Sequence, residues 1–245
     1  MLRKSVETLF PQYTVGLEGN CTFMYADVKR LVSAAQGILC DPLSLALKLE
    51  WHIGDRRATE VEVVNDWQAI KSRALKMTDE QLQQWTAKRQ APLTSCRLKQ
   101  DFIDSLTIKR LRGNFEYLKR HLIPNIGDAP ADAQMGLMST AWAIGAGFDQ
   151  TKPPRLELIA AAKSGDWLAA GAAARLREAG NKGVVDRNKH QDRMFANAAV
   201  VVARGLDRDA LWWPNKCPTE DSLKTLAIKA LDLGIAKASV LPDKE

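Results

Sequence analysis

Residues 18–37 read EGNCTFMYADVKRLVSAAQG and contain, in order, a helix end, a hairpin pattern and three spaced polar side chains. A carboxylate followed by glycine, as in Glu18-Gly19, is typical of the end of a helix. The following residues include several that favour β-strands, namely Thr22, Phe23, Tyr25 and Val32. We therefore expect an N-terminal helix that stops at Glu18 and a short β-hairpin directly after it.

The three polar side chains of this stretch are Glu18, Asp27 and Ser33, separated by eight and then five residues. Glu18 closes the predicted helix, Asp27 lies near the hairpin turn and Ser33 lies on the returning strand. All three can therefore converge, and we expect the chemistry of the protein at this place.

This spacing resembles the active-site pattern of phage-type lysozymes, in which Glu is followed after eight residues by Asp or Cys, and after five more by Thr. The Glu-Gly pair and the Tyr-x-Asp motif also stand where that family has them. Three departures are visible in the sequence. Ser33 replaces the threonine, Arg30 replaces a turn glycine, and the run AAQG at 34–37 keeps only the second glycine of the family's glycine-rich turn. A non-glycine residue at a turn position with positive φ costs about 1 kcal/mol, so we expect a reshaped hairpin.

The second half of the chain extends the resemblance in the same order. An apolar helix ending at Ile144-Gly145 is followed by Gly165-Asp166-Trp167, and then by a segment that contains Arg187-Asn188, Arg193 and Phe195. The similarity covers about residues 10–205 and includes the lysozyme-type domains of cell-wall-targeting effectors.

The resemblance implies a mainly α (α+β) fold, in which a small β-hairpin lobe is joined by a long helix to a helical lobe. We expect a lysozyme-like domain over residues 1–205. Its hairpin lobe covers about 18–40, an insertion about 50–98 and the helical lobe about 99–205, and a C-terminal helical extension covers 206–245.

The resemblance also implies a peptidoglycan-degrading muramidase that hydrolyses the β-1,4 bond between N-acetylmuramic acid and N-acetylglucosamine without a cofactor. Such a reaction needs one carboxyl that donates a proton and a second, ionised carboxyl. Glu18 would be the general acid and Asp27 the general base, and Ser33 would hold the attacking water. Further candidates are the cleft-lining residues Tyr25, Gln36 and Gly37, and Arg187 as the partner of the catalytic glutamate.

The composition is that of an ordinary globular protein, with 46% hydrophobic and 26% charged residues among 245. No apolar run reaches the roughly 18 residues of a membrane-spanning helix, so we expect none. The formal charge of +6 suits an anionic partner. The basic clusters at 109–112 and 119–121 fall on one predicted helix, where we expect a solvated face rather than a nucleic-acid site.

The N-terminus is basic but lacks a following apolar segment, so we expect no classical secretory signal. The resemblance implies that the protein is made in the cytoplasm and acts on the periplasmic cell wall after release through a membrane lesion or after injection. It implies as further partners an immunity protein or an injection-machine component.

The four cysteines are Cys21, Cys40, Cys96 and Cys217, and they form no CxxC pair. The three histidines, His52, His121 and His190, are isolated. We therefore expect no metal site. Buried free thiols are the expectation for the cysteines, with an approach of Cys21 to Cys40 across the hairpin left open.

Helical periodicity and capping residues predict the remaining elements. We expect an interruption near Pro11, a helix started by Asp41-Pro42 and a loop at 51–55. The further predicted helices cover about 59–73, 78–85, 99–122, 132–144, 155–163, 167–178 and 186–205, and a last one begins near 219. Trp67, Trp142 and Trp167 are expected in the core, and Trp212-Trp213-Pro214 against the main body or a partner.

Three other functions remain open from the sequence. The altered turn at Arg30 and 34–36 is compatible with a peptidoglycan-binding protein that does not cut. A lytic transglycosylase would use Glu18 alone. A basic helical protein could instead bind nucleic acid, with a steep dependence on salt.

Overall fold

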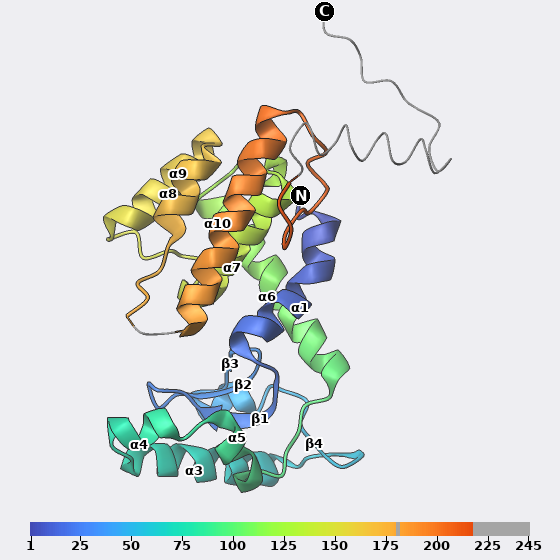
Figure 1. Cartoon of the computed structure of the whole chain (residues 1–245). Coiled ribbons are helices and arrows are strands. Elements are labelled where there is room, and N and C mark those ends of the chain that lie inside the picture. The colour runs from blue at the N-terminus through green and yellow to red at the C-terminus, as the bar shows by residue number, and fades with distance from the viewer. Residues whose placement is uncertain (180–181, 218–245) are drawn as a thin grey trace, which may run out of the picture.

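The computed structural model describes residues 1–179 and 182–217 and consists of two lobes joined by two helices (Figure 1). The fold is mainly helical with a small antiparallel sheet, which confirms the predicted fold class at that level. The joining helices are α1 (Lys4–Glu18) and α6 (Gln100–His121), and both pass from one lobe into the other.

The lower lobe contains the predicted hairpin as part of a three-stranded sheet. Strands β1 (Cys21–Ala26), β2 (Val32–Ala35) and β3 (Ile38–Leu39) lie in the order β1-β2-β3, all antiparallel. Tyr25 on β1 is paired with Ser33 on β2, so both side chains lie on the same face of the sheet. The third strand was not predicted, because two residues are too few to show an alternating pattern.

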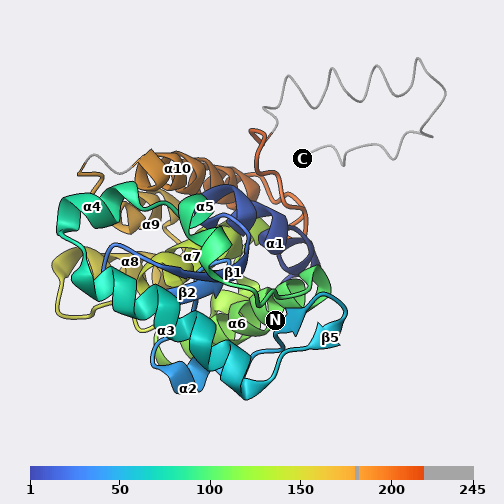
Figure 2. The ribbon, with the colours of Figure 1, turned by 90° about the horizontal axis from the view of Figure 1, so that it is seen from below.

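The insertion predicted at 50–98 is an integral part of this lobe, because its buried residues share one hydrophobic core with the sheet. Its helix α3 crosses the sheet, as the view from below shows (Figure 2). A β-sheet is stable only when one face is covered, and this helix covers it. The further elements of the lobe are α2 (Leu43–Ala46), β4 (His52–Ile53), β5 (Arg56–Arg57), α3 (Glu60–Lys76), α4 (Asp79–Gln84), α5 (Ala87–Gln90) and η1 (Ala91–Leu93).

Helix α3 begins near Thr59, as its sequence predicts. Thr59 and Glu62 form a reciprocal capping box at its start. Val61 is 69% exposed, whereas Val63 and Ile70 are buried. The buried face also carries Asp66, whose Oδ2 accepts the N–H groups of residues 95 and 96 at 2.8 and 2.7 Å.

The upper lobe is a helical bundle whose centre is α7 (Ala131–Ile144), buried on all sides as its apolar sequence predicts. Phe195 packs against α7 at Gly136, where a β-carbon would stand only 2.9 Å from the ring. The elements around α7 are η2 (Ile126–Asp128), α8 (Pro153–Ser164), α9 (Trp167–Ala174) and α10 (Lys182–Ala203).

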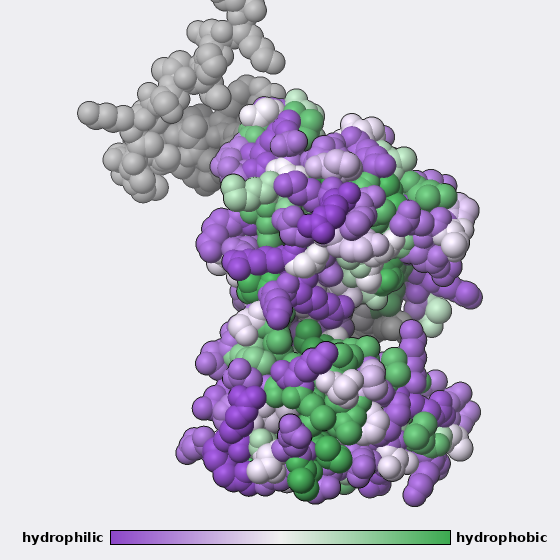
Figure 3. All heavy atoms as spheres, turned by 180° about the vertical axis from the view of Figure 1, so that it is seen from behind, coloured by the Kyte–Doolittle hydropathy of each residue, from purple (hydrophilic) through white to green (hydrophobic). Residues whose placement is uncertain are grey.

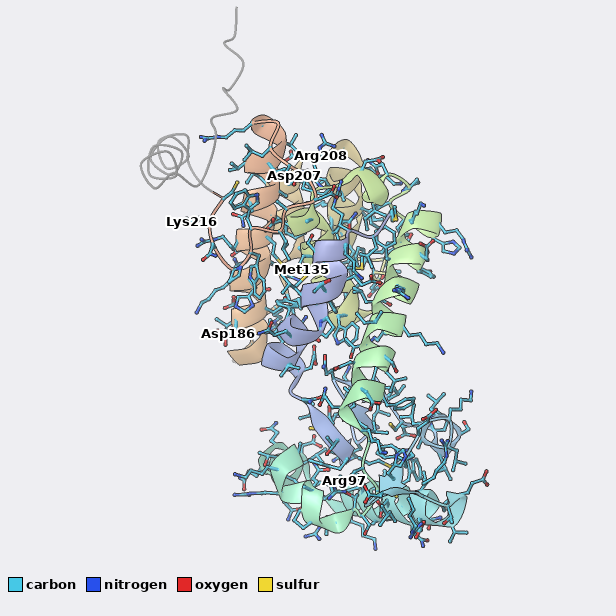
Figure 4. The ribbon with its side chains drawn as sticks, turned by 90° about the vertical axis from the view of Figure 1, so that its right-hand side faces the viewer. Arg97, Met135, Asp186, Asp207, Arg208 and Lys216 are labelled. Atoms are coloured by element: carbon cyan, nitrogen blue, oxygen red, sulfur yellow. The ribbon has the colours of Figure 1, made fainter. Side chains whose placement is uncertain are left out.

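Residues 206–217, the first part of the expected C-terminal extension, form an irregular strap across the upper lobe. Asp207, Arg208 and Lys216 mark its course, at the opposite end of the molecule from Arg97 of the lower lobe (Figure 4). The buried carboxylate of Asp132 holds the strap by accepting the N–H groups of Trp212 and Trp213 at 2.8 and 2.9 Å. The helix expected from about residue 219 lies outside the described residues.

The prediction of a break near Pro11 was wrong, because α1 is one continuous helix that contains the proline. Proline inside a helix removes one hydrogen bond and costs about 3 kcal/mol. The helix nevertheless continues since Val6, Phe10 and Tyr13 on one of its faces are buried in the main core.

Two predictions for residues 41–57 were also wrong. Asp41 does not cap a helix, because its carboxylate binds Lys71 and the N–H of Val32 instead, and α2 is a single turn. Residues 51–55 are not a plain loop: they belong to a second small hairpin, β4–β5, which begins after the buried Trp51.

The expected environments of the tryptophans are confirmed in part. Trp142 and Trp167 are buried in the core of the upper lobe, and Trp67 is only partly buried on the lower one. Trp213 docks onto the main body, where its ring lies 5.0 Å from that of Tyr13 and 5.3 Å from that of His190.

The aromatic cluster of Tyr13, His190 and Trp213 predicts a pH-dependent stability. Burial is the main cause that lowers the pKa of His190, so the folded protein favours its neutral form. Below about pH 6.5 the unfolded chain binds the proton more readily. The free energy of unfolding should therefore fall as the pH drops from about 6.5 towards the lowered pKa of His190, and it should level off below that pKa.

Urea titrations between pH 7.5 and 5 measure this effect, and His190→Gln should flatten the dependence. His121→Gln removes an exposed histidine of α6 and serves as the control. An equal slope in wild type and His190→Gln would contradict the prediction.

Candidate active site

Glu18 is the last residue of α1 and lies at the junction of the two lobes. Gly19 ends the helix as predicted, with a φ of +74° and its N–H bonded to the carbonyl of Val15 at 3.0 Å. The side chain of Glu18 is 26% exposed. The molecule narrows between the lobes, and its surface is hollowed at this waist (Figure 3).

Arg187 of α10 forms an ion pair with Glu18, through Nη2 and Oε1. Its side chain is only 6% exposed. Nη1 donates to the carbonyl of Ser139 on α7 at 3.0 Å, so a second hydrogen bond, to the upper lobe, fixes the guanidinium. Arg187 and Glu18 are thus in contact although 169 positions separate them in the sequence. The resemblance to phage-type lysozymes implied this pairing.

The second carboxylate oxygen of Glu18 faces the turn between β2 and β3. Gly37 occupies that turn with a φ of +73°, and a β-carbon there would stand 3.4 Å from Glu18 Oε2. Within the described part of the chain no group donates a hydrogen bond to this oxygen. Oε2 is therefore the atom of Glu18 that is free to react.

Asp27 follows β1 and shapes the turn to β2. Its Oδ1 accepts the N–H groups of Lys29 and Leu31, at 2.8 and 2.9 Å. Its Oδ2 has no hydrogen-bond partner among residues 1–179 and 182–217. One oxygen of Asp27 is thus structural and the other is available.

Tyr25 lies within electrostatic reach of both carboxylates. Burial is the main cause that raises the pKa of its phenol. The Cys21 thiol and then the negative charges of Glu18 and Asp27 raise it further. Tyr25 therefore lies in the electrostatic field of both carboxylates.

Ser33 and Gln36 differ in what they can touch. Ser33 lies opposite Tyr25 in the sheet and retains a slight exposure of 7%. Gln36 was expected to line the cleft, but its side chain is fully buried and bonded to Thr14 of α1. Gln36 therefore links the turn between β2 and β3 to α1, and it is not a substrate contact in this conformation.

The turn residues that depart from the family pattern adopt the conformation that glycine would favour. Arg30 has a φ of +62° and Ala35 a φ of +53°. The side chain of Arg30 donates to the carbonyl of Met77 at 3.1 Å and to Asp79 at 2.6 Å. Because these partners lie at the start of α4, the insertion stabilises a turn that arginine alone would disfavour.

Arg110 is a residue at the junction of the lobes whose position the sequence did not reveal. It belongs to the basic cluster at 109–112, which was expected to be solvated. Arg110 instead points inward and donates to the carbonyls of Gly37 and Trp142, at 3.0 Å each, whereas Arg112 two residues on is exposed. The spacing of Arg110 and Arg112 could have shown that they have different environments, because residues two positions apart lie on different faces of a helix.

Other kinds of site find no support in the described residues. No group of three or more His, Cys, Asp or Glu side chains there could hold a metal ion. Every described helix is too short or too polar to cross a lipid bilayer. The four cysteines are free thiols, with Cys21 partly exposed and the others buried.

Comparisons with protein-family models, with curated proteins and with solved structures found no match for this chain.

Replacing Gly37 with alanine tests the close approach to Glu18. The left-handed backbone makes any side chain there cost about 1 kcal/mol, and the new methyl group would stand against Oε2. We expect any activity that depends on Glu18 to fall about tenfold, as for a small misplacement of reacting groups. An activity assay and a urea titration measure the two effects.

Gly54→Ala is the matched control, because Gly54 has a φ of +58° but nothing within 4 Å of a new β-carbon. It should lose similar stability and keep full activity. Equal activity losses in the two variants would show that strain alone, and not contact with Glu18, is responsible.

Proposed function

We propose that this protein is a lysozyme-like muramidase that hydrolyses the β-1,4 bond between N-acetylmuramic acid and N-acetylglucosamine in peptidoglycan. The observation that carries the proposal is the meeting of Glu18, Arg187 and Gly37 at the waist of a two-lobed molecule. Asp27 follows two residues after Tyr25, whose phenol lies in the electrostatic field of both Glu18 and Asp27. The order of these residues in the chain supports a lysozyme-like arrangement of the fold.

In the proposed reaction, Oε2 of Glu18 and Oδ2 of Asp27 have different roles. Arg187 holds Oε1 of Glu18, so Oε2 carries the proton and gives it to the glycosidic oxygen as the bond to C1 breaks. Oδ2 of Asp27 takes a proton from the water whose oxygen bonds to C1. The hydroxyl of Ser33 orients that water, and no cofactor takes part.

Two alternatives each have an observation in their favour. Oδ1 of Asp27 is committed to two backbone N–H groups, which suits a structural aspartate and a lytic transglycosylase that uses Glu18 alone. The left-handed Arg30 and Ala35 suit a protein that binds peptidoglycan through a turn no longer shaped for catalysis.

Mass spectrometry of muropeptides after incubation with the protein separates these functions. A hydrolase releases reducing muramic acid ends, and a transglycosylase releases 1,6-anhydro ends. A binder sediments with cell walls and releases neither. Asp27→Asn should abolish release by a hydrolase and spare a transglycosylase, so an active Asp27→Asn variant would overturn the role proposed for Asp27.

We propose further that the cell wall is reached by release through a membrane lesion or by injection. In the second case an immunity protein would be the natural partner. A protein that binds the purified enzyme and blocks muropeptide release would support this, and toxicity in the periplasm but not in the cytoplasm is its cellular test.

A further inference from the structure

Arg110 joins the two lobes through a single guanidinium. It lies on α6, the helix that connects them, and it is half-buried. Nη1 donates to the carbonyl of Gly37 in the sheet of the lower lobe, and Nη2 donates to the carbonyl of Trp142 in the upper lobe, both at 3.0 Å. The residue therefore connects one wall of the candidate cleft to the other.

The environment of this guanidinium fixes its orientation. It lies 4.0 Å from the centre of the Trp142 ring, a cation–π distance. Trp142 stands in the last turn of α7, where carbonyl groups carry the negative end of the helix dipole. Stacking and two charge-assisted hydrogen bonds leave Arg110 little freedom to rotate.

Arg110 also lies in the electrostatic field of Glu18. Burial lowers the pKa of Arg110, and the negative charge of Glu18 acts in the opposite direction. The positive charge of Arg187 adds a smaller lowering effect. Arg187 binds Oε1 directly, whereas Arg110 binds the turn that lies against Oε2.

We propose that Arg110 is a positioning residue of the Glu18 site, which it serves by fixing the Gly37 turn against the free oxygen Oε2. The role rests on the proposed function, since it matters for turnover only if Glu18 donates a proton to a glycan. Without Arg110 the turn would move away from the reacting oxygen, and the bound sugar would lose its alignment.

Arginine is required for this role, and lysine cannot take it over. The planar guanidinium reaches two carbonyls in different lobes at once and stacks on Trp142. A lysine ammonium is a point charge without a flat face. Arg110→Lys should therefore keep the charge but lose most of the positioning.

The test compares turnover of solubilised glycan strands by wild type, Arg110→Met and Arg110→Lys. For Arg110→Met we expect kcat to fall about a hundredfold, as for a misplaced reacting group, with KM changed by less than about threefold. Arg110→Lys should recover less than about a tenth of the lost rate. A kcat of Arg110→Met within about threefold of wild type would overturn the proposal.

Arg112→Met is the matched control, because it removes the same charge from an exposed position of the same helix. Its kcat should remain at the wild-type value, which excludes an effect of net charge on binding to anionic walls. A loss equal to that of Arg110→Met would overturn the proposal. If Arg110→Met does not fold, the test rests on Arg110→Lys. A kcat of Arg110→Lys equal to that of wild type would then reject the positioning role of Arg110.

Amide hydrogen exchange separates a failure of this inference from a failure of the proposed function. Exchange at 37–39 should be about tenfold faster in Arg110→Met than in wild type, whether or not the protein cuts walls. If the wild type does not cut walls but exchange at 37–39 is still faster in Arg110→Met, the proposed function is rejected and the anchoring of the turn by Arg110 is retained. Unchanged exchange would reject the anchoring itself.

Discussion

Glu18→Gln is expected to lower the release of muropeptides from purified cell walls at least about a thousandfold, because general acid catalysis contributes factors of this order. Glutamine keeps the shape of the side chain, but its amide cannot donate a proton to the glycosidic oxygen as an acid. Oε2 is the oxygen concerned, since Oε1 is taken by Arg187. The measurement is the initial rate of reducing-end formation.

Glu116→Gln is the matched control for this experiment. Glu116 is exposed on α6, and the substitution changes the net charge by the same amount. It should leave the rate unchanged, and both variants should show the circular dichroism spectrum of wild type. A Glu18→Gln variant that cuts walls as fast as the parent would end the assignment of Glu18 as the acid.

Phe195→Ala is expected to lower the free energy of unfolding by about 3–5 kcal/mol, the usual cost of removing a fully buried aromatic ring. The ring is 1% exposed and is enclosed by two glycines, Gly136 of α7 and Gly171 of α9. New β-carbons at these positions would stand 2.9 and 3.0 Å from Phe195 atoms. Both helices are therefore packed directly against Phe195, so removal of its ring leaves a cavity between them.

Urea denaturation followed by tryptophan fluorescence measures the loss, and Leu168→Ala on α9 is the control. Leu168 is 65% exposed, so its removal should change stability by less than about 0.5 kcal/mol. Gly136→Ala gives the converse test, because the added methyl group must displace the ring. A Phe195→Ala protein as stable as the control variant would mean that the bundle repacks around the missing ring.

Local patterns were sufficient wherever one short segment determined its own conformation. The helix end at Gly19, the hairpin at 21–35, the start of α3 near Thr59 and the apolar helix α7 could all be predicted, because each depends on neighbours a few residues away. Patterns failed where a distant partner competed with a local rule. Pro11 remains inside α1 because its neighbours are buried, and Asp41 binds Lys71 instead of capping a helix.

The candidate site shows the same division. Glu18, Asp27 and Ser33 could be proposed from the sequence, since they lie within sixteen consecutive residues, 18–33, of a helix end and a hairpin. The inward orientation of Arg110, the burial of Gln36 and the insertion helix that supports Arg30 required the tertiary structure. Each of these depends on which face of one element packs against another far along the chain. The sequence by itself thus determined which groups are candidates for the chemistry, whereas only the packing of the two lobes decided which groups hold those candidates in place.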